Sequence, residues 1–128
     1  MGFDVTMTVE ARRDRVWSVI MAPPMDPDRR DYPAWVALGL ECAADWGDPD
    51  YQRPIVPSRG FPTDAAEETI SAWEEAVEDG SACGASWLTL AELLPHRARL
   101  DGIIGDVIDK MSQFVEPDET RLVVWFVP

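Results

Sequence analysis

Histidine, cysteine and lysine are scarce in this sequence of 128 residues. His96 is the only histidine, Cys42 and Cys83 are the only cysteines, and Lys110 is the only lysine among eleven basic residues. One histidine excludes a multi-histidine metal site. Two cysteines without a recognisable leader segment predict free thiols in a reducing compartment. No apolar run approaches the ~20 residues that cross a bilayer, so we expect a cytoplasmic protein that does not contact a membrane.

Familiar catalytic and cofactor signatures are also missing. The sequence has no phosphate-binding glycine loop, dinucleotide fingerprint, nucleophile elbow or zinc-ligand spacing. We therefore expect a binding protein without a cofactor rather than an enzyme. A small hydrolase is kept as an alternative, using an acid pair or a thiolate–imidazole pair of Cys83 and His96, although no third residue is placed to orient that pair.

Acidic residues dominate the charge. The chain has 24 Asp and Glu against 11 Lys and Arg, which gives a formal net charge of −13. Such a surface repels nucleic-acid phosphates and anionic lipids, so we expect neither as a direct partner. A basic protein partner is favoured instead, for example a DNA-handling protein that the acidic surface inhibits by mimicking nucleic-acid phosphates. The candidate partner-binding residues lie in the acidic helix predicted for 64–79: Glu74, Glu75, Glu78 and Asp79. The alternative is an ordinary solvated helix face.

The hydrophobic pattern predicts one α+β domain over residues 1–128. Residues 3–10 alternate between apolar and polar, and residues 16–21 form a second apolar segment after a polar turn at 11–15. The continuous apolar run 122–127 is typical of a strand in the middle of a sheet. We expect a small, mainly antiparallel sheet built from this N-terminal hairpin and the C-terminal strand.

About four helices should pack on the sheet, in the order β-β-α-α-α-α-β. The predicted helices are 33–44, 64–79 with a capping box of Asp64 and Glu67, a short helix opened by a capping box of Thr89 and Glu92, and 100–115. The residues from 80 to 86 are all small and predict a tight or flexible connection. Gly102 and Gly105 are unusual inside a helix, where each costs about 1 kcal/mol relative to alanine. Close packing against the sheet would explain them.

Arginine and aromatic residues occur together in two long proline-containing loops, 22–33 and 45–63. This combination suits a nucleotide or another planar anion, through stacking and bidentate hydrogen bonds. The candidate ligand-binding residues are Tyr51, Arg53, Arg59 and Trp87. The alternatives are that Arg53 and Arg59 pair with surface acids and that Trp87 anchors the core. Two acidic groups in these loops are interpreted as solvated turns rather than cation sites: Asp26, Asp28 and Asp31, and Asp45, Asp48 and Asp50.

Several segments together resemble a known family. They are the apolar helix from Tyr32 to Ala44, the Arg-Gly-Phe-Pro segment 59–62, the Ser-Trp-Leu-Thr-Leu segment 86–90 and the terminal Val-Val-Trp-Phe segment 123–126. The chain resembles a family of small uncharacterised proteins of tailed bacteriophages and prophages, with the Arg-, Ala- and Asp-rich usage of an actinobacterial host. The resemblance implies an accessory protein in the host cytoplasm that binds a host protein or a nucleotide-like small molecule, for example as a counter-defence factor.

Overall fold

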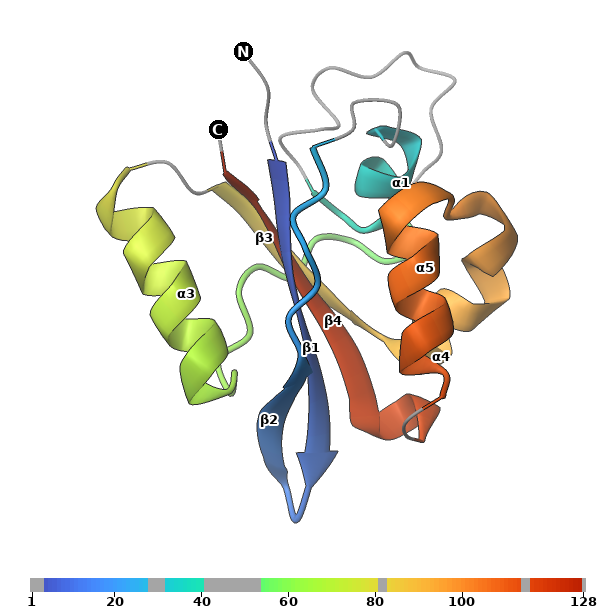
Figure 1. Cartoon of the computed structure of the whole chain (residues 1–128), viewed down its shortest axis with the longest axis horizontal. Helices are drawn as coiled ribbons and strands as arrows, with labels where there is room; N and C mark the ends of the chain where they lie inside the picture. The colour runs from blue at the N-terminus through green and yellow to red at the C-terminus, as the bar shows by residue number, and fades with distance from the viewer. Residues whose placement is uncertain (1–3, 28–31, 41–53, 81–82, 114–115, 128) are drawn as a thin grey trace.

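The computed structural model describes residues 4–27, 32–40, 54–80, 83–113 and 116–127. The fold is α+β, with a four-stranded antiparallel sheet between helices (Figure 1). The elements in chain order are β1 (Asp4–Arg13), β2 (Val16–Met21), α1 (Tyr32–Ala37), α3 (Glu67–Glu78), β3 (Cys83–Thr89), α4 (Leu90–Leu93), the 3-10 helix η2 (Leu94–Arg99), α5 (Gly102–Met111), the 3-10 turn η3 (Pro117–Glu119) and β4 (Thr120–Val127).

The strand order is β2-β1-β4-β3, with every neighbouring pair antiparallel. The predicted N-terminal hairpin and C-terminal strand are both confirmed. The hairpin turn is shorter than expected, because Arg13 pairs with Val16 and only Asp14 and Arg15 lie between the strands. Both of these residues have positive φ, 51° and 67°, as a tight two-residue hairpin turn requires.

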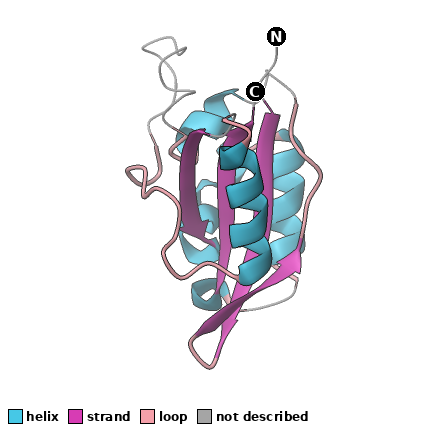
Figure 2. Ribbon diagram, turned by 90° about the vertical axis from the view of Figure 1, so that its left-hand side faces the viewer, coloured by secondary structure: helices cyan, strands magenta, loops and turns pink. Residues whose placement is uncertain are grey.

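β4 lies in the centre of the sheet and is covered on both faces, which confirms the interpretation of its apolar run (Figure 2). Its side chains alternate between two separate cores. Leu122, Val124 and Phe126 join the larger core beneath α1, α4 and α5. Val123 and Trp125 form the smaller core, to which Trp73 of α3 belongs. The described elements therefore form three layers, and among the described helices only α3 lies on the face of the smaller core.

A buried polar pair anchors the segment after β2. The indole Nε1 of Trp35 donates a hydrogen bond to Oδ2 of Asp26 at 3.1 Å, and both residues are fully buried. The backbone of Asp26 also pairs with Val5, which covers the outer edge of β1. The prediction that Asp26 belongs to a solvated turn is therefore wrong. Asp28 and Asp31 lie outside the described residues.

Three helix boundaries differ from the predicted ones. α1 ends at Ala37, because Gly39 takes a positive φ of 84° and its N–H donates to the carbonyl of Val36. α5 covers only the middle of the predicted 100–115 helix. α3 begins after Ala66, whose N–H donates to Oε2 of Glu10 rather than to a capping carboxylate of Asp64.

The capping box at α4 is confirmed. Thr89 Oγ1 accepts a hydrogen bond from the N–H of Glu92, and the Glu92 carboxylate accepts one from the N–H of Thr89. The connection predicted for residues 80–86 is wrong from Cys83 onward, because that part is the start of β3. The structure thus has one more strand than the sequence pattern predicts. Within the described part of the chain, no helix combines the length and apolarity needed to span a membrane.

Candidate ligand-binding site

α3 covers only part of its face of the sheet, and a cavity of about 410 Å³ lies beside the segment that leads into it. The lining combines three arginines, three aromatic side chains, two carboxylates, two threonines and a proline: Arg12, Trp17, Arg59, Phe61, Pro62, Thr63, Asp64, Trp87, Thr89, Asp118 and Arg121. This volume lies within the ~300–1,000 Å³ of small-molecule sites.

Arg121 of β4 forms the floor of this cavity and is only 1% exposed. Its Nε donates to Oε1 of Glu10 at 2.7 Å, and its Nη1 donates to Oδ1 of Asp64 at 2.9 Å. Among the described residues, Nη2 has no hydrogen-bond partner. A buried donor left unpaired costs about 1–3 kcal/mol, so Arg121 retains unused hydrogen-bonding capacity.

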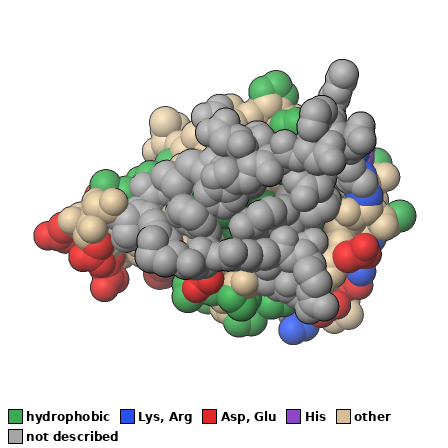
Figure 3. Space-filling model, turned by 90° about the horizontal axis from the view of Figure 1, so that it is seen from above, with side chains coloured by type: hydrophobic (Ala, Val, Ile, Leu, Met, Phe, Trp, Pro, Cys, Tyr) green, Lys and Arg blue, Asp and Glu red, His purple; other side chains and the backbone are tan. Residues whose placement is uncertain are grey.

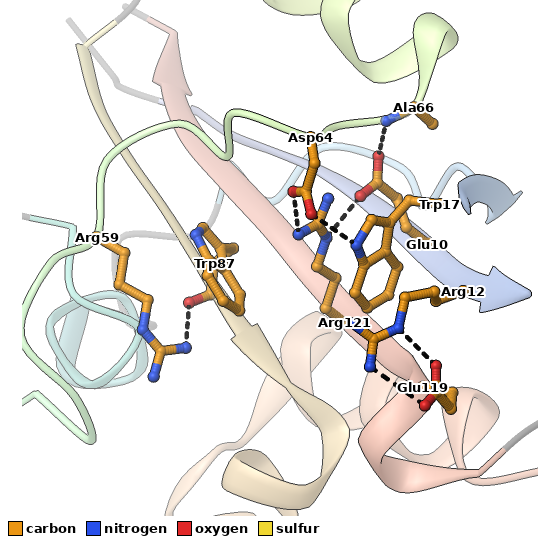
Figure 4. Close-up of polar contacts among 9 residues, drawn as sticks. All are labelled: Glu10, Arg12, Trp17, Arg59, Asp64, Ala66, Trp87, Glu119 and Arg121. Atoms are coloured by element: carbon orange, nitrogen blue, oxygen red, sulfur yellow. Dashed lines mark hydrogen bonds and ion pairs between the residues drawn. The ribbon is translucent and has the colours of Figure 1, made fainter. Parts of the chain in front are cut away.

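Two indole rings flank the Arg121 guanidinium. Its Cζ lies 3.9 Å from the ring centroid of Trp17 and 5.3 Å from that of Trp87. The Nε1 of Trp17 donates to Oδ2 of Asp64 at 3.1 Å, so Asp64 bridges Arg121 and Trp17 (Figure 4). The guanidinium and both rings are thereby held in fixed positions.

Two further arginines extend this arrangement. Arg12 lies 5.1 Å from the centroid of Trp17 and pairs with both carboxylate oxygens of Glu119. Arg59 lies 4.3 Å from the centroid of Trp87, donates to the Trp87 carbonyl and pairs with both oxygens of Glu92. The side chains therefore alternate across the sheet as Arg59, Trp87, Arg121, Trp17 and Arg12, which we name the Arg–Trp ladder.

Strand register explains how the ladder forms. Arg121 pairs with Glu10 of β1 on one side and with Thr89 of β3 on the other, and Arg12 pairs with Trp17 in the hairpin. Directly paired residues of antiparallel strands project from the same face of a sheet. Arg121, Glu10, Arg12 and Trp17 therefore share the α3 face.

The arginines of the ladder shift the pKa values of their carboxylate partners. The hydrogen bond from Arg59 is the largest influence on Glu92 and lowers its pKa despite partial burial. The hydrogen bond from Arg12 does the same for the pKa of Glu119. For Asp64, burial raises the pKa. The hydrogen bond and the charge of Arg121 lower it by more, so the pKa of Asp64 lies below its ordinary value. All three carboxylates are therefore held ionised near neutral pH.

The structure brings together two of the four predicted ligand-binding residues. Arg59 and Trp87 contact each other and both line the cavity. Tyr51 and Arg53 lie outside the described residues. The alternative prediction, that Arg59 pairs with an acidic residue, is also confirmed. Arg59 forms an ion pair with Glu92 and at the same time lines the cavity.

Sequence reasoning missed Arg12, Trp17 and Arg121. One signal for Arg121 was available, since it is the only charged residue in β4, immediately before the apolar run. A charge at a position covered on both faces of a sheet requires a buried partner. Here that partner is Glu10, which is fully buried.

The other candidate residues lie away from the cavity or outside the described chain. Glu74, Glu75, Glu78 and Asp79 are exposed on α3 and its C-terminal end. His96 lies in η2, but the side chain of Cys83 is outside the described part, so their pairing stays a hypothesis. Asp45, Asp48 and Asp50 also lie outside it.

No family model, curated protein or solved structure matches this chain. The resemblance to phage proteins therefore stays a prediction, and the functional interpretation depends on the geometry of the cavity.

Proposed function

We propose that this protein binds a planar, anionic small molecule of the nucleotide type in the cavity of the Arg–Trp ladder. The observation that carries the proposal is the buried Arg121 guanidinium, fixed between Trp17 and Trp87 with Nη2 unpaired among the described residues. Arg12 and Arg59 add two more guanidinium groups at the cavity wall.

The chemistry of the lining fits such a ligand. Arginine recognises phosphate with parallel hydrogen bonds, and an indole face stacks on a nucleobase. Arg12 and Arg59 are held by Glu119 and Glu92, so their positions are set before a ligand arrives. An oxyanion that reached Nη2 of Arg121 would recover the hydrogen bond that this atom lacks.

The overall charge of −13 favours a small anion in this local site over a long nucleic acid. The phosphate backbone of a long nucleic acid would extend beyond the cavity along the acidic surface, which repels it. A single nucleotide in the cavity would mainly contact the arginines. In the phage setting that the resemblance implies, the protein would sequester a nucleotide-like signal of the host. No chemical step is needed for this function.

Calorimetric titration tests the proposal, with mononucleotides, cyclic mono- and dinucleotides and ADP-ribose as probes. We expect at least one probe to bind, and Arg12→Gln/Arg59→Gln to weaken that binding by about tenfold or more, since charge-assisted hydrogen bonds contribute about 1.5–3 kcal/mol each. Arg13→Gln is the matched control, because Arg13 is exposed on the same hairpin and does not line the cavity.

Two results would contradict the proposal. One is the absence of binding heat for every probe over a range of temperatures. The other is an equal loss of affinity in Arg13→Gln and in a single Arg12→Gln variant, which would indicate general charge attraction rather than binding in the cavity.

A further inference from the structure

The C-terminal half of α3 concentrates negative charge where a helix tolerates it least. Glu74, Glu75 and Glu78 fall in its last turns, Asp79 is its C-cap residue, and the last turn contains no basic residue. Carboxylates near a helix C-terminus oppose the helix dipole, and like charges four residues apart repel. Seen from above, carboxylates gather at the left-hand end of the molecule, the side on which α3 lies (Figure 3).

A second cavity lies directly beside this charge. Its volume is about 240 Å³, and it lies between α3 and strands β1 and β4. Its lining is Thr6, Ala72, Glu75, Ala76, Asp79, Trp125 and Val127. The small side chains of Ala72 and Ala76 leave the sheet uncovered here, and the exposed carboxylates of Glu75 and Asp79 belong to successive turns of one helix side.

Trp125 supplies an independent indication of a ligand. It is 1% exposed, it lines this cavity, and among the described residues its indole Nε1 has no hydrogen-bond partner. Buried tryptophan N–H groups usually find an acceptor. Its ring contacts Trp73 and Phe61, at centroid distances of 5.7 and 6.2 Å, so the ring is fixed by its neighbours.

We propose that this second cavity is a docking site for a basic segment of a partner protein, which inserts one arginine or lysine side chain between Glu75 and Asp79. The apolar stem of that side chain lies against Ala72, Val127 and the Trp125 ring. Its cationic head is held by the two carboxylates. Docking also covers the Trp125 indole, whose Nε1 has no acceptor among the described residues.

Charge and shape together select this occupant. Among the described residues, no ion pair involves a carboxylate of α3. A cation at Glu75 and Asp79 relieves their mutual repulsion and the opposition to the helix dipole. Of the four predicted partner-binding residues, Glu75 and Asp79 line the cavity, whereas Glu74 and Glu78 do not and contribute only to the surrounding potential.

A titration followed by ¹H–¹⁵N NMR tests the docking site with a defined probe. The probe is a blocked five-residue peptide of alternating glycine and arginine, and the same peptide with glutamine in place of arginine is its control. We expect the arginine peptide to shift the Trp125 indole resonance, which is assigned by its absence in Trp125→Phe. The glutamine peptide should leave that resonance unmoved.

Matched variants separate docking from general attraction. Glu75→Gln/Asp79→Asn and Glu67→Gln/Glu68→Gln each remove two charges from the same helix, but only the first pair lines the cavity. We expect the arginine peptide to bind about tenfold more weakly to the first variant and less than about threefold more weakly to the second. Equal weakening in both variants, or a Trp125 indole resonance that does not move, would overturn the docking site.

Discussion

The guanidinium of Arg121 lies over the face of Trp17, with 3.9 Å from its Cζ to the ring centroid, and both side chains donate hydrogen bonds to Asp64. Arg121 comes from β4, Trp17 from β2 and Asp64 from the segment that leads into α3. These three residues therefore join the centre of the sheet, its edge strand and the segment that leads into the helix covering this face. Glu10 adds β1 to the group through Nε of Arg121.

Replacing Arg121 with methionine should strongly destabilise the fold. The variant leaves the fully buried carboxylate of Glu10 without its cationic partner, and breaking a buried pair on one side costs about 3–5 kcal/mol. Urea unfolding measures the loss. The double variant Glu10→Gln/Arg121→Met removes both charges and should recover part of it. A loss below about 1 kcal/mol in Arg121→Met would show that the pair contributes little.

Acid should weaken the fold partly through Glu92. Its pKa is lowered from the ordinary 4.5 by the hydrogen bond from Arg59, so its contribution to stability is complete above pH 4.5 and is lost as the pH falls through the folded-state value. Glu92→Gln should therefore reduce the slope of unfolding free energy against pH below about pH 4.5. Urea unfolding at a series of pH values checks this. Identical slopes in the two proteins would exclude a contribution from Glu92.

Segments with periodic hydrophobicity were predictable from the sequence, because burial of one face places apolar residues at regular intervals. The alternation in β1 identified a strand, and the continuous apolar run in β4 identified both a strand and its place in the middle of the sheet. The capping box of Thr89 and Glu92 was equally visible, since its two hydrogen bonds join residues three apart.

β3 was missed because its first residues are small. Ser86 is fully buried and its Oγ accepts a hydrogen bond from the N–H of Arg59, while the Oγ of Ser58 lies 3.4 Å from the carbonyl of Ala85. A larger side chain at Ser86 would displace this loop. The small residues therefore allow a loop to cover the sheet edge. Because that loop is distant in sequence from β3, the local residue pattern does not indicate this requirement.

The ladder was only partly predictable for a related reason. Arg59 and Trp87 were identified by residue type, but Arg12, Trp17 and Arg121 come from three different strands. Only the strand order places Arg121 between Trp17 and Trp87. Without the order and register of the strands, the sequence does not show that Arg121 lies next to these two tryptophans.

Gly105 should be irreplaceable within α5 for steric reasons. A Cβ at this position would lie 2.4 Å from the carbonyl oxygen of Leu100 and 2.8 Å from Nη1 of Arg97. Helix propensity alone favours alanine by about 1 kcal/mol, whereas overpacking costs about 1–3 kcal/mol. We expect Gly105→Ala to lower the thermal midpoint, measured by circular dichroism. Asp106→Ala, at an exposed neighbouring position, should change it little, and a raised midpoint in Gly105→Ala would contradict the clash.

Neutralising the acidic end of α3 should stabilise the free protein. Glu75→Gln/Asp79→Asn removes a like-charge pair four residues apart and two charges that oppose the helix dipole, so the unfolding free energy should rise by about 0.5–1 kcal/mol. Glu67→Gln/Glu68→Gln should lower it, because carboxylates in the first turn favour the dipole. Urea unfolding at low ionic strength distinguishes the two signs, and high salt should reduce both changes. A change in unfolding free energy of the same sign in both variants would exclude an effect of the helix dipole. If the first variant gains stability while it loses the arginine peptide, α3 retains unfavourable charge for binding at the cost of stability.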